Sequence, residues 1–350
     1  MNRREFLATG ISGMMTVALA TAAETPRRAN LGLLLYSYGQ RSKAEREQGF
    51  AEPARFLEFA HQRGASAIQI PLGTTTAEQA AQLRRAADRL EMKIEGIVAP
   101  PKDAGADLSR FSRELQSAHQ CGVSIVRTVL LGGRRYEVFE KADEFAVFSR
   151  GSEEALKRAV AIAEEHKVTL AVENHKDYRV DELIDLLRRI SSEWVGVCLD
   201  TGNNLALLDE PHATVEALAP FTRTVHLKDI GVEECDQGFR MAEVPLGTGT
   251  FDLPRMVTAI RRANPNVIFQ LEMMTRDPLL IPCLTEKYWA TLPSLPGRDL
   301  ARTLAAVKKL ARKDALMRMS SLAAADQIAI EDRNVRESFD FAVRTRLIPS

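Results

Sequence analysis

Short apolar runs alternate with longer amphipathic segments eight times along the chain, and this alternation restricts its possible folds more than any other feature. The short runs are rich in Val, Ile and Leu, which is typical of strands buried on both faces of a parallel sheet. Strands are expected at Leu31–Tyr36, Ala65–Pro71, Lys93–Val98, Ser124–Leu130, Val168–Asn174, Val195–Asp200, Thr222–Leu227 and Val267–Met273. Helices are expected between them at Ala77–Leu90, Leu108–Gln120, Glu153–His166, Val180–Ile190 and Leu253–Ala263.

Eight strand–helix units between residues 29 and 297 favour the α/β class, as a (β/α)8 TIM barrel, which commonly uses about 250 residues. The alternative is a doubly wound open sheet, although no GxGxxG motif follows the first strand. Residues 298–350 are charged and rich in alanine, and we expect them to form a C-terminal helical extension. This extension would pack on the barrel or on a partner subunit of a homo-oligomer.

Two connections between the expected elements are long. Leu131–Ser152 follows the fourth strand and Lys228–Asp252 follows the seventh. In a barrel, the loops that follow strands lie at the catalytic face, so we expect both segments to be loops that cover a substrate.

The first residues have the form of an export signal. Arg3 and Arg4 are followed by Phe6-Leu7 and a weakly apolar run, and small residues offer cleavage sites near residue 22. The run is too short and too weak for a comfortable membrane span. We therefore predict that residues 1–23 are a twin-arginine signal peptide. The protein would then engage the twin-arginine export machinery and reside in the periplasm.

Charge and cysteine usage exclude other classes of protein. The chain carries 47 basic and 47 acidic side chains, without the basic excess typical of nucleic-acid binding. Its four cysteines show neither zinc-site spacing nor the density of a disulfide scaffold. We expect no nucleic-acid partner.

Four of the expected strands end in a polar residue that can bind a metal. Glu173, Asp200, His226 and Glu272 interrupt otherwise apolar strands where each leaves the barrel. Three carboxylates and an imidazole suit one divalent ion, namely Mn²⁺, Co²⁺, Mg²⁺ or Zn²⁺. The alternative is a buried salt-bridge network with Lys228 and His175, but three carboxylates need more positive charge than these two side chains supply.

The order and spacing of five motifs resemble the xylose isomerase-like barrel superfamily, the sugar phosphate isomerase/epimerase group. The similarity extends from about residue 30 to 296, and the motifs are AVENH (171–175), CLDTGN (198–203), TVHLKD (224–229), PLGTGTFD (245–252) and QLEMM (270–274). The resemblance implies that Glu173, Asp200, His226 and Glu272 bind one divalent metal. It also implies that Glu173 and Glu272 are the catalytic acid and base.

This site could remove a proton beside a carbonyl, because a divalent ion stabilises the resulting enediolate and two carboxylates can move protons on opposite faces. The sequence therefore predicts an isomerase or epimerase acting on an unphosphorylated ketose or a related keto-sugar. Many ketose epimerases carry a histidine near the position of Asn203, which leaves room for another reaction. Further candidates for contacting the substrate or supporting the metal ligands are His175, Asn203, Lys228, Glu95 and Arg240.

Three other functions were weighed. A lyase or dehydratase acting on 3-keto-glycosides or keto-inositols would share the first chemical step. A nuclease of the endonuclease four type needs many histidines, and the chain has only six. A binding protein without catalysis would not require both Glu173 and Glu272.

Overall fold

The computed structural model describes residues 29–45, 50, 52–102 and 105–349, and within them eight parallel strands close into a barrel. This confirms the expected fold class. The strands follow one another around the barrel in the order β1-β10-β7-β6-β5-β4-β3-β2. Their bounds are β1 (Leu31–Leu34), β2 (Ala67–Pro71), β3 (Lys93–Ile97), β4 (Ile125–Thr128), β5 (Thr169–Glu173), β6 (Val195–Asp200), β7 (Thr222–Leu227) and β10 (Ile268–Leu271).

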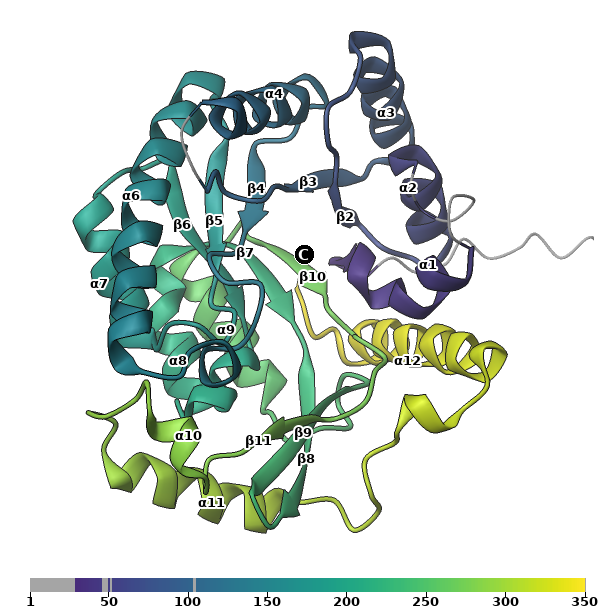
Figure 1. The fold of residues 1–350 in the computed structure, drawn as a ribbon. Coiled ribbons are helices and arrows are strands. Elements are labelled where there is room, and N and C mark those ends of the chain that lie inside the picture. Colours follow the sequence, from purple (N-terminus) through teal and green to yellow (C-terminus); the bar gives the residue numbers. More distant parts are fainter. Residues whose placement is uncertain (1–28, 46–49, 51, 103–104, 350) are drawn as a thin grey trace, which may run out of the picture.

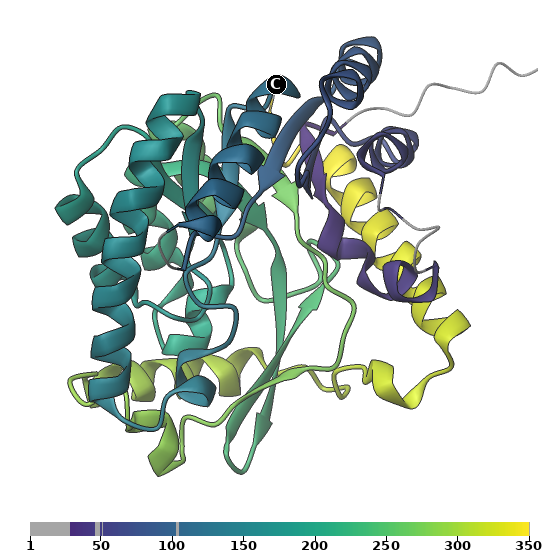
Figure 2. The same cartoon turned by 45° about the horizontal axis from the view of Figure 1, so that its top comes forward.

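Helices surround this barrel (Figures 1 and 2). They are α1 (Gly39–Glu45), α2 (Pro53–Gln62), α3 (Ala77–Leu90), α4 (Ala106–Gln120), α5 (Arg135–Val138), α6 (Ala142–His166), α7 (Val180–Ile190), α8 (Pro211–Leu218), α9 (Leu253–Ala263), α10 (Glu286–Trp289), α11 (Gly297–Leu310) and α12 (Ala324–Thr345). Short 3-10 turns lie at η1 (Leu35–Tyr38), η3 (Asn203–Leu207), η4 (Ala219–Phe221) and η5 (Met319–Ser321). None of the helices in the described ranges is long and apolar enough to cross a membrane.

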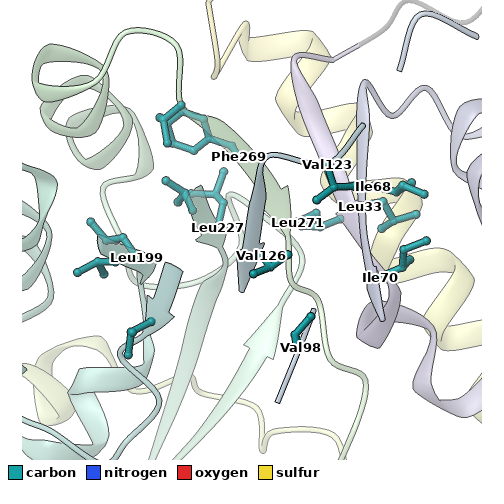
Figure 3. Close-up of a cluster of buried hydrophobic side chains, with 14 of the residues drawn as sticks. Leu33, Ile68, Ile70, Val98, Val123, Val126, Leu199, Leu227, Phe269 and Leu271 are labelled. Atoms are coloured by element: carbon teal, nitrogen blue, oxygen red, sulfur yellow. The ribbon is translucent and has the colours of Figure 1, made fainter. Parts of the chain in front are cut away.

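The two faces of the barrel strands differ in polarity. Alternate residues point to opposite faces of a strand, and one set joins the large apolar cluster beneath the helices. Figure 3 shows members of this cluster, among them Leu33, Ile68, Leu199 and Leu271. The other set includes buried polar side chains such as Gln69, which is 0% exposed. The outer face therefore supplies the apolar core, while the interior of the barrel holds polar groups.

The two long connections are more ordered than the sequence predicted. Within Lys228–Asp252, β8 (Asp229–Cys235) and β9 (Gly238–Val244) form an antiparallel hairpin, and β11 (Leu279–Ile281) extends it to a separate three-stranded sheet. Within Leu131–Ser152, α5 forms and α6 already begins at Ala142. The expectation of loops was wrong because these segments bury apolar residues outside the barrel, where the strand–helix alternation does not apply.

The last helix packs against the barrel. Val335, Phe339 and Ala342 of α12 belong to the same apolar cluster as the strands, and Leu347 and Ile348 follow them into it. Figures 1 and 2 both show α12 beside α1, and Asp332 of α12 forms ion pairs with Arg41 of α1 and, at 3.0 Å, with Arg63. A C-terminal helix is thus present and closes the helical layer between β10 and β1. The boundary at residues 297–298 stays a prediction, and the expected signal peptide lies outside the described residues.

Replacing Phe339 by alanine should lower the free energy of unfolding by about 3–5 kcal/mol, because it empties a buried aromatic site in the main core. Urea unfolding followed by circular dichroism measures this loss. Val147→Ala on α6 is the control, since Val147 is 61% exposed and should change stability by less than about 0.5 kcal/mol. Equal effects of the two substitutions would show that α12 is a peripheral cap.

Candidate functional site

The structure brings together the four residues that the sequence singled out as metal ligands. Glu173 ends β5, Asp200 ends β6, His226 lies on β7 and Glu272 follows β10. One oxygen or nitrogen of each lies within 4.8 Å of the others, and none of the four residues is more than 5% exposed. They meet because the carboxyl ends of parallel barrel strands share one rim; Asp200 and His226, for example, are direct partners in the register.

Three side-chain atoms in this group lack hydrogen-bond partners. Asp200 Oδ2, His226 Nδ1 and Glu272 Oε2 are buried without a hydrogen bond of acceptable geometry. His226 Nδ1 lies 3.0 Å from Glu272 Oε2 and 3.4 Å from Glu173 Oε2. The Lys228 ammonium forms ion pairs with the two carboxylate oxygens, and a divalent ion at this place would also give His226 Nδ1 the partner that a buried polar atom normally has.

A chain of hydrogen bonds inside the barrel orients the His226 ring. Its Nε2 lies 2.7 Å from Gln69 Oε1, and the Gln69 amide donates to Glu95 Oε2 at 3.0 Å. Because the Gln69 oxygen can only accept, Nε2 carries a proton, and the other ring nitrogen, Nδ1, faces the carboxylates. Glu95 also accepts hydrogen bonds from Thr224 and Gln270. The structure thus places Glu95 one layer below the four residues, where it acts on His226 through Gln69.

Both oxygens of Glu173 are engaged by neighbours. Arg127 Nε donates to Oε2 at 2.5 Å, and Asn203 Nδ2 donates to Oε1 at 3.0 Å. Burial opposes ionisation of this carboxyl, but the Arg127 guanidinium together with His226 and His175 outweighs it and lowers the pKa of Glu173 to about 2. Glu173 is therefore held as a carboxylate.

Lys228 lies among the carboxylates. Its Nζ is 2.8 Å from Asp200 Oδ2, 3.1 Å from Glu272 Oε2 and 3.6 Å from Glu243 Oε1. Burial opposes the charge, but these carboxylates outweigh it and raise the pKa of Lys228. Lys228 therefore stays positively charged and neutralises part of the buried negative charge.

His175 and Arg240 have different surroundings. His175 Nδ1 lies 3.0 Å from the Leu131 carbonyl oxygen, and burial lowers the pKa of its imidazole to about 4 despite the nearby Glu173. His175 is thus a neutral ring beside the site. Arg240 is not gathered with the four residues; it pairs with Glu233 across the hairpin at 3.3 Å.

Three charged residues of this region were not among the candidates from sequence. The Lys176 ammonium donates to Asn203 Oδ1, and Arg276 Nη2 lies 2.6 Å from Glu243 Oε1. Lys176 directly follows His175 at a strand exit, a position that could have singled it out. Glu243 and Arg276 had no such signal, because only the folded hairpin brings Glu243 to Lys228, and Arg276 joins the group by pairing with Glu243. From the sequence, only Lys228 and His175 were counted as positive charges near the carboxylates, and the structure adds Lys176 and Arg276.

A second group of potential ligands contains Glu173, Cys198 and His226. Metals bind the thiolate form of cysteine, whereas burial raises the pKa of the Cys198 thiol well above its usual value. The set with three carboxylates and one imidazole thus fits a cation better. It forms an oxygen-rich candidate site for a divalent cation at the carboxyl rim of a (β/α)8 barrel.

The chain belongs to the family described as Xylose isomerase-like TIM barrel, whose model matches residues 57–292. This match confirms the family resemblance found in the sequence motifs. It includes all four residues of the candidate metal site.

Two curated relatives match part of the chain. The chain is 29% identical over 106 residues to the 3-oxo-isoapionate decarboxylase of Pectobacterium atrosepticum, covering 30% of this chain and 38% of the relative. It is 30% identical over 164 residues to SgbU of Haemophilus influenzae, named for an L-ribulose-5-phosphate 3-epimerase, covering 44% and 55% of the two chains. The chain thus matches less than two thirds of the length of either relative.

Among solved structures, a D-psicose 3-epimerase determined in the presence of D-fructose has the same fold. It shows a TM-score of 0.59 at 15% identity, covering 89% of this chain and 97% of the other.

Replacing Gln69 by leucine should weaken Mn²⁺ binding by about 10- to 100-fold, because His226 loses the acceptor that holds its Nδ1 lone pair toward the carboxylates. Isothermal titration calorimetry measures the affinity directly. Gln82→Leu on the exposed part of α3 is the matched control and should leave it unchanged. Wild-type affinity in Gln69→Leu would remove Gln69 from the support of the site.

Proposed function

We propose that the protein is a divalent-metal-dependent isomerase or epimerase of an unphosphorylated ketose or related keto-sugar. The observation that carries this proposal is the pair of buried carboxylates, Glu173 and Glu272, which lie 3.4 Å and 3.0 Å from His226 Nδ1. Their strands, β5 and β10, are three places apart in the ring of eight, so the two side chains approach the centre from different directions. Proton transfer on two faces of one carbon needs this arrangement.

Glu173, Asp200, His226 and Glu272 are the residues that would hold the metal. Their oxygen-rich donor set suits Mn²⁺, Co²⁺, Mg²⁺ or Zn²⁺. When bound, the ion supplies Lewis-acid stabilisation of the negative charge that develops on the substrate oxygens.

The protein side chains provide the remaining chemistry. One glutamate removes the proton from the carbon beside the carbonyl, and the other returns a proton. Return to the opposite face of the same carbon gives an epimer, and return to the neighbouring carbon gives an isomer. Arg127 and Asn203 hold Glu173 in place, and Lys228 supports Asp200 and Glu272. Because the residues are almost fully buried, water is kept from the intermediate.

A lyase is the second candidate, acting on 3-keto-glycosides or keto-inositols through the same first step. Two observations favour keeping it. Asn203 contacts Glu173 where many ketose epimerases carry a histidine nearby, and one relative is named as a decarboxylase rather than an epimerase. After the first proton is removed, loss of a leaving group from the next carbon would replace reprotonation.

Glu173→Gln and Glu272→Gln should each reduce turnover by about 10²- to 10⁴-fold, since an amide cannot take up the proton. The measurement is NMR in D₂O with the Mn²⁺-loaded protein, a panel of unphosphorylated ketoses and a panel of 3-keto-glucosides. Deuterium entering beside the carbonyl without loss of a group identifies an isomerase or epimerase. Release of the aglycone or water identifies a lyase.

Glu165→Gln on the exposed face of α6 is the matched control and should retain full exchange. Circular dichroism of each variant shows whether the fold is retained. A folded Glu173→Gln or Glu272→Gln protein with wild-type exchange would contradict the acid–base assignment.

We also propose that export through the twin-arginine route delivers the protein to the periplasm. The motif around Arg3 and Arg4 supports this proposal. Replacing both arginines by lysine should retain the protein in the cytoplasm, as measured by cell fractionation and immunoblotting. Equal periplasmic amounts of the wild type and this variant would exclude the route.

A further inference from the structure

Lys176 is a buried cation that the proposed reaction does not use. It follows β5 by three residues and is only 3% exposed, and its backbone is in the left-handed region with φ of 71°. A non-glycine residue in this region is held there by its surroundings, and such residues are frequent at functional sites. Its ammonium hydrogen-bonds Asn203 Oδ1 and, within the described part of the chain, forms no ion pair with a carboxylate.

Lys176 belongs to a continuous cluster of charges around the candidate metal site. Ion pairs and hydrogen bonds through Asn203 connect its members. The carboxylates are Glu173, Asp200, Glu243 and Glu272, and the cationic side chains are Arg127, Lys176, Lys228 and Arg276. Ionised, these four carboxylates and four cations cancel one another.

A divalent ion among the ligands would leave this cluster with a net charge of about +2. Excess charge in a buried site is costly unless a partner of opposite sign is present. Lys176 is the cation with an amide oxygen as its hydrogen-bond partner, while Arg127, Lys228 and Arg276 each pair with a carboxylate. It is therefore the cation best able to bind an anionic group from outside the protein.

A cavity adjoins the same cluster. It measures about 480 Å³, which lies in the range of small-molecule sites, and Glu243 and Arg276 form part of its wall. Arg312 and Arg333 lie on its exposed side, together with the acidic residues Asp314 and Glu337. Glu243 and Arg276 thus connect the charged cluster to this space, whereas Lys176 and the four candidate metal ligands do not line it.

We infer that Lys176 is a substrate-binding residue and that the substrate carries an anionic oxygen group, a carboxylate or a phosphate, in addition to its carbonyl. This inference rests on the proposed isomerase or epimerase chemistry and narrows the substrate to an acidic keto-sugar; a preference for the phosphate would revise the unphosphorylated substrate proposed above. The ammonium of Lys176 would donate to the anionic oxygens while Asn203 keeps it oriented. The net charge of the metal-loaded site then matches the charge of the ligand.

The test measures binding of three probes to the full chain by isothermal titration calorimetry. The probes are 2-keto-D-gluconate, which carries a carboxylate, D-fructose 6-phosphate, which carries a phosphate, and neutral D-fructose. With Mn²⁺ bound, at least one anionic probe should bind 10-fold or more tightly than D-fructose. The preference should shrink after EDTA treatment, because the site then loses its positive excess. Which anionic probe is preferred distinguishes a carboxylate from a phosphate.

Three variants test the role of Lys176 itself. Lys176→Gln keeps a hydrogen-bond donor but removes the charge, so affinity for the preferred anion should fall at least 10-fold while affinity for D-fructose is retained. Lys176→Arg keeps the charge and should restore most of the preference. Lys308→Gln on the exposed surface of α11 is the control and should behave as the wild type. Circular dichroism and the melting temperature show whether each variant is folded.

Two results would overturn the inference. One is that neither anion binds the wild-type protein more tightly than D-fructose does. The other is that folded Lys176→Gln keeps the full preference for anions, which would make Lys176 only a support for Asn203. The proposed function is tested separately. Anion binding with no deuterium exchange would contradict the isomerase or epimerase activity. Deuterium exchange on neutral ketoses alone would support that activity and exclude the acidic substrate.

Discussion

The buried polar interior of the barrel is the constraint on which the rest of the structure depends. A barrel of this kind commonly fills its interior with branched apolar side chains, whereas here Gln69, Glu95, Thr224 and Gln270 form one hydrogen-bonded layer. The ionised residues lie above this layer. Burying a polar group costs free energy unless it has a hydrogen-bond partner. Because these partners lie on different strands, the hydrogen bonds restrict the positions of the strands relative to one another.

The hydrogen-bonded layer also restricts which residues fit on the strands beside it, away from the rim. Gly32 on β1 is an example, since a Cβ there would lie 2.2 Å from Gln270 Oε1. The glycine therefore makes room for the layer that supports His226 through Gln69 and Glu95. Apolar packing beneath the helices holds the strands in register, and the polar interior then directs Nδ1 of His226 toward the carboxylates.

Segments outside the barrel complete the site. The hairpin supplies Glu243, which pairs with Lys228, and the turn after β10 supplies Arg276, which pairs with Glu243. Helix α12 borders the neighbouring cavity and also belongs to the main apolar core. The site thus combines the barrel rim, on which the family motifs lie, with the hairpin, the turn after β10 and helix α12. The hairpin and the turn add charged residues, and α12 forms part of the wall of the neighbouring cavity.

Local pattern was sufficient for much of the fold. The bounds of β6, β7, α3, α7 and α9 agree with the ranges expected from sequence, because strand and helix periodicities are local properties. The hairpin was missed, although Asp236 and Gly238 in its turn are typical hairpin residues, since the segment was considered only as a barrel loop. The start of α6 was missed because Gly151 interrupts its pattern, while burial of Phe145 on the core extends the helix.

By itself, the sequence determined the barrel class, the family and the four polar residues at strand ends, because parallel strands place their carboxyl ends on one rim. It could not determine which charges surround those residues. Lys176, Glu243 and Arg276 meet the site only through a strand exit, a hairpin and a turn that converge in three dimensions. The tertiary structure decided the charge balance of the site, since electrostatic energy depends on distance and burial and not on separation along the chain.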